Sequence, residues 1–211
     1  MSDDGDHERA QLSEVEISAL LERLESIPVA NVGDAMDRIS AMDSGIRPMW
    51  PGARIVARAY TILTRAGDNQ AIHEALDQAK ENEVLVVNGF ADVSRALVGE
   101  LIAGRAKMNS LGGFVIDGAI RDVQEIERLR IPVFARAVTP AGPFKFGPSR
   151  HQVPIAVGGQ SVSPGDIVIG DSDGVVVIPL RELVSTVAAA EAIQANEREK
   201  RRSIGAWETD T

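Results

Sequence analysis

Between residues 53 and 138 the sequence alternates between apolar runs of strand length and helical patterns, and this alternation limits the possible folds more than any other feature. Strands are expected at residues 53–63, 84–87, 113–116 and 133–138, and helices at residues 68–79, 101–108 and 121–129. Strands that are connected through helices in this way are typical of β-helix-β units. This part of the chain is therefore predicted to form an α/β layer.

The segments on either side have a different character. Near the start, Ser13 and Glu16 form a capping-box pair ahead of a helix that runs to about residue 25, and a short helix is expected over residues 33–39. After Pro140, short strands separated by Gly, Pro and Asp are expected at residues 154–157, 160–162, 166–169 and 175–178. Their spacing is typical of an antiparallel or mixed β-layer.

The two ends of the chain complete the expected organisation. Residues 1–11 are polar and acidic, which predicts a disordered tail. A final helix is expected over residues 181–202, where apolar residues recur at helical spacing. We find no internal repeat and no linker, so residues 12–211 are predicted to form a single domain with two stacked β-layers flanked by helices.

Composition excludes several classes of site and partner. The chain has 211 residues, no cysteine and a net charge of −9. Disulfides, thiolate metal sites and cysteine nucleophiles are therefore excluded, and a cytoplasmic location is expected. Aromatic residues are few and no broad basic face is apparent, so nucleic-acid binding is not expected. No apolar run has the length of a membrane span, so no membrane partner is expected.

The pair Arg121-Asp122 is the first candidate for a functional site. It follows the apolar segment 114–117 and Gly118, where a strand is expected to turn into a helix. Ligands of open α/β sheets usually bind at such carboxyl ends of strands. Arg121 could clamp a carboxylate, and Asp122 could bind Mg²⁺ or Mn²⁺. Asp122 and Glu125 also form an Asp-x-x-Glu capping pair, and taken alone this motif favours the cap.

The segment from Gly99 to Ile102 is the second candidate. An apolar stretch ends at Gly99, and a helical pattern then begins with Glu100, Leu101 and Ile102. The first amides of a helix lack partners within the helix and form a pocket for an anion. Close packing at Gly99 explains the glycine equally well. Glu100 could orient a metal-bound water, or it could be an acid favoured by the helix dipole.

Other polar residues are weaker candidates. His73 is expected at the surface or as a cap, and His151 lies in a polar loop. The acidic segment 171–174 is interpreted as a β-turn in which Gly174 supplies an unusual backbone angle. No Walker A motif, dinucleotide fingerprint or serine nucleophile elbow is present.

Together these motifs resemble the RraA-like family, which includes the class II 4-hydroxy-4-methyl-2-oxoglutarate / 4-carboxy-4-hydroxy-2-oxoadipate aldolases. The resemblance extends over roughly residues 28–180. It is carried by the segments 67–69, 94–96, 99–103, 115–118, 121–125, 164–166 and 173–176. It implies an α/β fold, specifically a layered β/β/α sandwich of the swivelling-domain kind, assembled as homotrimers or homohexamers with sites between subunits.

The resemblance also implies roles for individual residues. The backbone amides of residues 99–102, from Gly99 and Glu100 to Leu101 and Ile102, would hold the carboxylate of a pyruvyl group. Arg121 would contact the substrate oxygens, and Asp122 would be the direct protein ligand of the divalent metal, with the remaining metal positions filled by water. Glu100 stands where the family commonly carries an acid, often Asp. A neighbouring subunit could add Glu197 or Glu199 from its C-terminal helix.

The function implied is a metal-dependent (class II) aldolase that cleaves a 4-hydroxy-2-oxoacid, such as 4-hydroxy-4-methyl-2-oxoglutarate, and releases pyruvate. Oxaloacetate decarboxylation passes through the same enolate, so the same site is expected to catalyse it. The family also contains non-catalytic regulators that bind ribonuclease E, and the acidic surface would suit a basic partner. The presence of Glu100, Arg121 and Asp122 together favours the enzyme.

Overall fold

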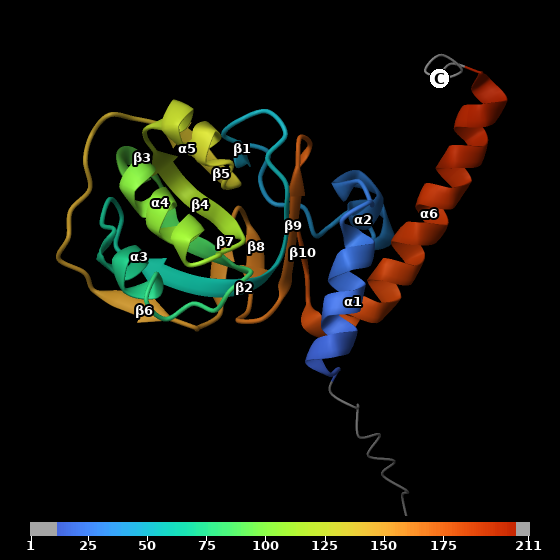
Figure 1. Cartoon of the computed structure of the whole chain (residues 1–211), viewed down its shortest axis with the longest axis horizontal. Helices are drawn as coiled ribbons and strands as arrows, with labels where there is room; N and C mark the ends of the chain where they lie inside the picture. Colours follow the sequence, from blue (N-terminus) through green and yellow to red (C-terminus); the bar gives the residue numbers. More distant parts are fainter. Residues whose placement is uncertain (1–11, 206–211) are drawn as a thin grey trace, which may run out of the picture.

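An eight-stranded mixed sheet forms the framework of the structure, a computed structural model that describes residues 12–205 (Figure 1). The strand order is β1-β5-β4-β3-β2-β9-β10, and β6 pairs with β2. Strands β2 to β5 are parallel, and the other pairings are antiparallel. The strands are β1 Arg47–Pro48, β2 Ile55–Thr64, β3 Glu83–Val98, β4 Gly113–Ile120, β5 Val133–Val138, β6 Ser149–His151, β9 Ile167–Asp171 and β10 Gly174–Ile178. A separate antiparallel hairpin consists of β7 Ile155–Val157 and β8 Gln160–Val162.

Helices form two groups around this sheet. Figure 1 shows α3, α4 and α5 together on one side of the molecule, and α1, α2 and α6 together on the far side of β9 and β10. The helices are α1 Glu14–Leu24, α2 Val29–Ala35, α3 Gln70–Ala75, α4 Glu100–Met108, α5 Val123–Leu129 and α6 Leu183–Ile204, the last preceded by a 3₁₀ turn at Leu180–Glu182.

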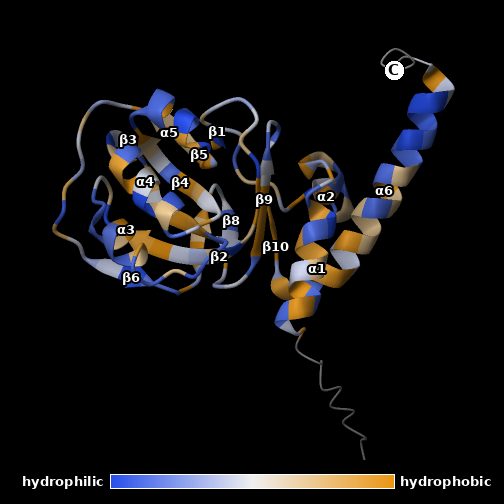
Figure 2. Cartoon of the chain, viewed as in Figure 1, coloured by the Kyte–Doolittle hydropathy of each residue, from blue (hydrophilic) through white to orange (hydrophobic). Residues whose placement is uncertain are grey.

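Two apolar clusters lie on opposite sides of β9 and β10. Ile167 and Ile169 of β9 pack with α1, α2 and α6, whereas Val168 between them belongs to the larger cluster beneath α3, α4 and α5. Side chains of a strand alternate between its two faces, so one strand can serve both clusters. The apolar colouring of β9 and β10 in Figure 2 reflects this burial on both faces.

The strand β4 lies in the interior of the sheet and leads to the candidate site. All eight of its residues are buried. A fully buried and largely apolar strand of this kind is typical of a parallel sheet that is covered on both faces, and its one acid, Asp117, is paired with Arg136. The strand expected at 113–116 continues to Ile120, so Arg121 and Asp122 follow its carboxyl end directly, and α5 begins at Val123 rather than at Arg121.

The predicted α/β class is confirmed, and several predicted elements have nearly the expected bounds. The capping box of α1 is present, because Ser13 Oγ accepts from the Glu16 amide at 3.3 Å and a Glu16 carboxylate oxygen accepts from the Ser13 amide at 2.8 Å. The expected turn at residues 171–174 is also present. In it the Asp173 amide donates to Asp171 Oδ1 at 2.9 Å, and Gly174 has a φ of +137°. The predicted tail at residues 1–11 lies outside the described residues.

The largest difference from the sequence-based prediction is the length of β3. A strand of four residues was expected at 84–87, but β3 continues to Val98. Its register with β4 shifts after Asn88, and Phe90 and Ala91 have positive φ values of 61° and 55°. The polar, irregular middle of the strand hides its continuation, which carries the chain directly into Gly99.

Two helices also differ from the prediction. The helix expected at 33–39 is α2, which begins after Pro28 and ends at Ala35, because Asp37 and Arg38 adopt left-handed backbone angles. The helix expected at 68–79 is reduced to Gln70–Ala75. Asp68 and Asn69 belong instead to the turn that joins β2 to α3, where they bond to other segments.

Within residues 12–205, no helix is both long and apolar enough to cross a membrane.

Candidate functional site

The N-terminus of α4 is the first component of the site. β3 ends at Val98, Gly99 is the N-cap residue, and the helix begins at Glu100, as expected. Gly99 has an extended backbone with φ −143°, so its conformation does not require glycine. Glycine is required there because a side chain would have no space. A Cβ atom there would lie 2.6 Å from Asp122 Oδ2 and 3.0 Å from Arg121 Nε.

Asp122 caps α4 rather than its own helix. The Glu100 amide donates to Asp122 Oδ2 at 3.1 Å, and Asp122 makes no side-chain capping bond to α5. The Asp-x-x-Glu interpretation is therefore wrong, and Glu125 instead pairs with Arg128 at 3.1 Å. The reason is the backbone of Asp122, whose left-handed angles (φ 58°, ψ 42°) direct the side chain away from the first turn of α5.

Arg121 lies between Asp122 and a small cavity. Its amide donates to the Val98 carbonyl at 2.9 Å, which fixes the backbone beside the end of β3. Its Nε atom is 3.4 Å from Asp122 Oδ2. Because the carboxylate lies near the Nε edge of the guanidinium, the remaining N–H groups are left to face a ligand.

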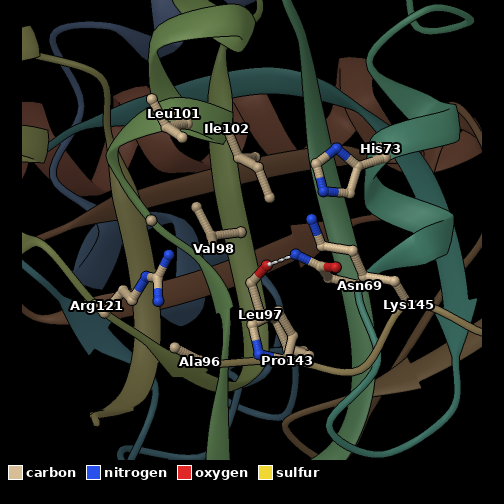
Figure 3. Close-up of a pocket in the computed structure, with 11 residues that line it drawn as sticks. Asn69, His73, Ala96, Leu97, Val98, Leu101, Ile102, Arg121, Pro143 and Lys145 are labelled. Carbon is tan, nitrogen blue, oxygen red and sulfur yellow. Dashed lines mark hydrogen bonds between the residues drawn. The ribbon is translucent and has the colours of Figure 1, made fainter. Parts of the chain in front are cut away.

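The cavity has a volume of about 80 Å³ and joins the predicted residues to others (Figure 3). In Figure 3, Arg121 lies on one wall and Asn69, His73 and Lys145 lie on the opposite wall, with Val98 and Ile102 between them. The full lining is Asn69, His73, Ala96, Leu97, Val98, Gly99, Leu101, Ile102, Arg121, Pro143 and Lys145. The predicted residues Gly99, Leu101, Ile102 and Arg121 are thus brought together, and Asp122 contacts this group through Arg121 and the Glu100 amide.

Two amides at the start of α4 are available to a ligand. Asp122 accepts from the Glu100 amide, and the Ala103 amide donates to the Gly99 carbonyl at 3.0 Å. Within the described part of the chain, no hydrogen bond is found for the amides of Leu101 and Ile102. Both residues line the cavity, and such unpaired amides at a helix N-terminus favour an anion.

The opposite wall was not found from the sequence. Asn69 Nδ2 donates to the Leu97 carbonyl at 3.0 Å, while its Oδ1 is buried without a partner within the described residues. His73 was expected at the surface or as a cap, but it lines the cavity. Burial, and next the nearby Lys145 cation, lower the pKa of His73 below its usual range. The segment 67–69 carried the only sequence signal for this wall.

The other predicted acids do not reach the cavity within one chain. Glu100 is exposed and its side chain is not part of the lining, although its amide takes part in the site. Glu197 lies 3.5 Å from Arg201 on α6, and Figure 1 shows α6 on the opposite side of the molecule from α4. His151 is bonded to Glu74 at 3.0 Å and does not line the cavity.

The donors at this site fit a hydrated metal ion rather than one enclosed by protein ligands. No group of three or more His, Asp or Glu side chains is placed to hold a metal within residues 12–205. Asp122 uses Oδ2 for its two contacts, and no hydrogen bond to Oδ1 is found within the same residues. Mg²⁺ is often bound by one or two carboxylates, with water and substrate as its other ligands. The residues present are compatible with that arrangement.

Substitution of Gly99 by Ala is expected to destabilise the protein by about 1–3 kcal/mol, because the new methyl group must displace the Asp122 carboxylate. The free energy of unfolding in urea measures this effect. Gly104→Ala is the control in the same helix, since a Cβ there meets nothing within 4 Å. That variant is expected to be about 1 kcal/mol more stable. Equal stability changes in the two variants would contradict the close contact at Gly99.

The fold agrees with the comparisons with known proteins. The family model described as "RraA-like: Aldolase/RraA" matches residues 29–177, which include every lining residue of the cavity. The chain therefore belongs to the RraA-like family.

Individual relatives and solved structures are similar over most of the chain. A protein of Halalkalibacterium halodurans named "Putative 4-hydroxy-4-methyl-2-oxoglutarate aldolase" is 35% identical over 193 residues, which are 92% of this chain and 91% of that protein. The crystal structure of an uncharacterized protein from Pseudomonas syringae pv. tomato has a TM-score of 0.82 at 26% identity and covers 91% of this chain and 94% of its own. The RNA-processing inhibitor RraA from Thermus thermophilus has a TM-score of 0.66 at 29% identity, and the match covers 72% of this chain and 92% of that chain.

Proposed function

We propose that the protein is a divalent-metal-dependent aldolase that cleaves a 4-hydroxy-2-oxoacid, such as 4-hydroxy-4-methyl-2-oxoglutarate, and releases pyruvate. The observation that carries the proposal is the meeting of three features at one cavity. These are the free amides of Leu101 and Ile102, the guanidinium of Arg121 and the carboxylate of Asp122 beside it. The names of several relatives support a lyase of this kind.

The pyruvyl end of the substrate fits the wall formed by α4 and Arg121. Its carboxylate would accept from the amides of Leu101 and Ile102, where the helix dipole also favours negative charge. Arg121 would donate to the carbonyl oxygen at C2. The Asp122 carboxylate accepts from the Glu100 amide, so it leaves the amides of Leu101 and Ile102 to the substrate carboxylate.

Asp122 would hold Mg²⁺ or Mn²⁺, and the bound ion would supply a Lewis acid that stabilises negative charge on the substrate oxygens. Cleavage begins when water, oriented by Glu100 in this proposal, takes the proton of the C4 hydroxyl. The C3–C4 bond then breaks, and its electron pair moves to the C2 oxygen as the pyruvate enolate forms. Arg121 stabilises that oxygen through its N–H groups, and water finally protonates C3.

The same arrangement supports decarboxylation of oxaloacetate, because loss of carbon dioxide leaves the same pyruvate enolate. Arg121 and the two amides would hold oxaloacetate in the same orientation. No base is needed at C4 in that reaction. We therefore expect decarboxylation to depend on Arg121 and Asp122 but less on Glu100.

A second copy of the chain is part of this proposal. The buried residues of α6 end at Ala190, yet the helix continues to Ile204 with an exposed, mainly polar surface (Figure 2). This extension carries Glu197 and Glu199 away from the body of its own chain. In a homotrimer or hexamer, one of these acids could approach the site of a neighbouring subunit.

Pyruvate release tests the proposed function directly. With Mg²⁺ or Mn²⁺ present, the protein is expected to release pyruvate from 4-hydroxy-4-methyl-2-oxoglutarate and from oxaloacetate, and a chelator is expected to stop both reactions. Pyruvate can be followed by coupling its reduction to oxidation of a nicotinamide cofactor. The control is the spontaneous decay of oxaloacetate with metal but without protein. No release above that control from any 4-hydroxy-2-oxoacid or from oxaloacetate, with either metal, would contradict the aldolase.

The alternative is a non-catalytic regulator that binds a ribonuclease E-like partner. The structural similarity to the RNA-processing inhibitor from Thermus thermophilus supports this alternative. A net charge of −9 would also suit a basic partner. Absence of turnover combined with salt-sensitive binding to such a ribonuclease would favour the regulator over the enzyme.

A further inference from the structure

We propose that Asp68 is a positioning residue, whose buried carboxylate fixes the segment 139–147 so that Lys145 faces Arg121 across the cavity. We call this segment the strap, because it connects β5 to β6 across the cavity and contributes Pro143 and Lys145 to the lining. Lys145 matters for activity only if the cavity binds an anionic substrate, so the role of Asp68 rests on the proposed function.

Asp68 is a fully buried acid whose partners are backbone amides. Its exposed fraction is 0%, and within the described residues no cationic side chain forms an ion pair with it. Oδ1 accepts from the Gln70 amide at 2.9 Å, while Oδ2 accepts from the amides of Phe146 at 2.7 Å and Gly147 at 3.1 Å. Burial of a carboxylate is costly unless its oxygens are satisfied, and these three bonds satisfy them.

The turn around Asp68 also pairs with the strap through backbone atoms. The Phe144 amide donates to the Gly67 carbonyl at 2.8 Å, and the Asn69 amide donates to the Phe144 carbonyl at 3.0 Å. These bonds hold Phe144, and the Asp68 carboxylate holds Phe146. Lys145 lies between the two and therefore has little freedom in its backbone.

The other end of the strap is fixed to β3. Arg95 donates to the Gly142 carbonyl at 2.7 Å, and its guanidinium carbon lies 4.0 Å from the centre of the Phe144 ring. The Ala96 amide donates to the Ala141 carbonyl at 2.8 Å. The strap is thus held against the segment of β3 that leads into α4, so both walls of the cavity are tied to the same strand.

These bonds matter for the site because they fix the backbone of Lys145, whose side chain faces the cavity. In Figure 3 its side chain enters the cavity from the wall opposite Arg121, and its ammonium group lies near His73. Burial first, and then the Lys145 cation, hold the pKa of His73 below its usual range. Lys has a flexible four-carbon side chain, so its position depends on a fixed backbone. Asp68 supplies that fixed backbone without touching the cavity itself.

The effect of Asp68→Asn on its own is the first part of the test. Asn replaces one acceptor oxygen by an amide donor, which must oppose either the Gln70 N–H or the N–H groups of Phe146 and Gly147. In either orientation the strap is held less strongly, because a neutral oxygen is a weaker acceptor than a carboxylate. We expect faster hydrogen exchange of the strap amides, measured by mass spectrometry. We also expect kcat/KM for pyruvate release to fall about tenfold, chiefly through KM, because a contact to a charged group is weakened.

A double-mutant cycle with Lys145→Met is the second part. If Asp68 acts through Lys145, Asp68→Asn is expected to cause little further loss of kcat/KM once Lys145 is absent. Asp166→Asn is the matched control, because Asp166 is also buried and accepts from two backbone amides, those of Ser163 at 2.7 Å and Leu180 at 3.1 Å. Asp166 is not a lining residue, so its effect should add to that of Lys145→Met.

Thr64→Val keeps the test decisive if Asp68→Asn does not fold. Thr64 Oγ1 donates to the Asp68 carbonyl at 2.8 Å, so its loss loosens the same turn more gently. Two results would overturn the role of Asp68: unchanged hydrogen exchange of the strap amides, or a loss of kcat/KM that adds to the loss caused by Lys145→Met. If the wild-type protein releases no pyruvate, the proposed function fails by itself. In that case the Kd for 2-oxoglutarate, which has two carboxylates but no C4 hydroxyl, replaces kcat/KM for the wild-type protein, the two single variants and the double variant. A wild-type protein that neither cleaves nor binds these acids would overturn both proposals.

Discussion

Replacement of Asp122 by Asn is expected to lower the rate of pyruvate release about 10³-fold, the loss expected when several kcal/mol of charge stabilisation is removed. The fold should change little, because an Asn oxygen can still accept from the Glu100 amide. A neutral amide is, however, a poor ligand for a hard divalent cation compared with a carboxylate. Asp122→Ala removes both functions, so it should in addition lose about 1 kcal/mol of stability from the missing cap.

Three measurements separate these effects. Pyruvate release reports activity, Mn²⁺ binding followed by electron paramagnetic resonance reports the metal, and urea unfolding reports the cap. Glu125→Gln is the matched control, since Glu125 lies one turn further on, pairs with Arg128 at 3.1 Å and does not line the cavity. It should leave activity unchanged. Metal-dependent cleavage that survives in Asp122→Asn and Asp122→Ala would show that Asp122 is not the ligand.

Substitution of Arg121 by Lys is expected to lower kcat about 10²-fold, the usual loss when a donor to a developing oxyanion is removed. The charge is retained, but Lys lacks the planar set of N–H groups that can bond Asp122 and a substrate oxygen at once. Asp122 lies 3.4 Å from the Nε edge, so a compact ammonium group would be drawn toward that carboxylate and away from the cavity.

Steady-state kinetics with 4-hydroxy-4-methyl-2-oxoglutarate and with oxaloacetate measure this second prediction. Both reactions should lose kcat to a similar extent, because both form the pyruvate enolate. Arg128→Lys is the control. Arg128 lies on α5, the helix that follows Arg121, is 74% exposed and contacts Glu125. A change in KM alone, with kcat preserved, would mean that Arg121 binds the ground state and not the enolate.

The elements that sequence reasoning placed well are those with a strong local signal. β4 begins with an apolar run at residues 113–116, and α1 has a capping box, so each is recognisable from its own residues. Only residues 84–87 of β3 were predicted, because the middle of the strand is polar and irregular and is held in the sheet by pairing with β4. Its continuation depends on pairing with a separate strand, which the local residue pattern of β3 does not show.

The candidate site divides in a similar way. Gly99, Arg121 and Asp122 were identified from their residue types and spacing, and the structure brings them together. The role of Asp122 as a cap was assigned to the wrong helix, because its left-handed backbone cannot be read from an Asp-x-x-Glu pattern. His73 and Lys145 were missed as cavity residues, since neither stands in a recognisable motif and they come from separate segments.

The sequence by itself determined the α/β class, the family and the chemical identity of one wall of the cavity, because these depend on local patterns and on motifs within short segments. Only the tertiary structure decided that Asp122 caps α4, that Lys145 and His73 face Arg121, and that Asp68 holds the strap between them. Each of these contacts joins residues that are separated along the chain, and such contacts form only when the parallel sheet places the ends of β2, β3 and β4 side by side.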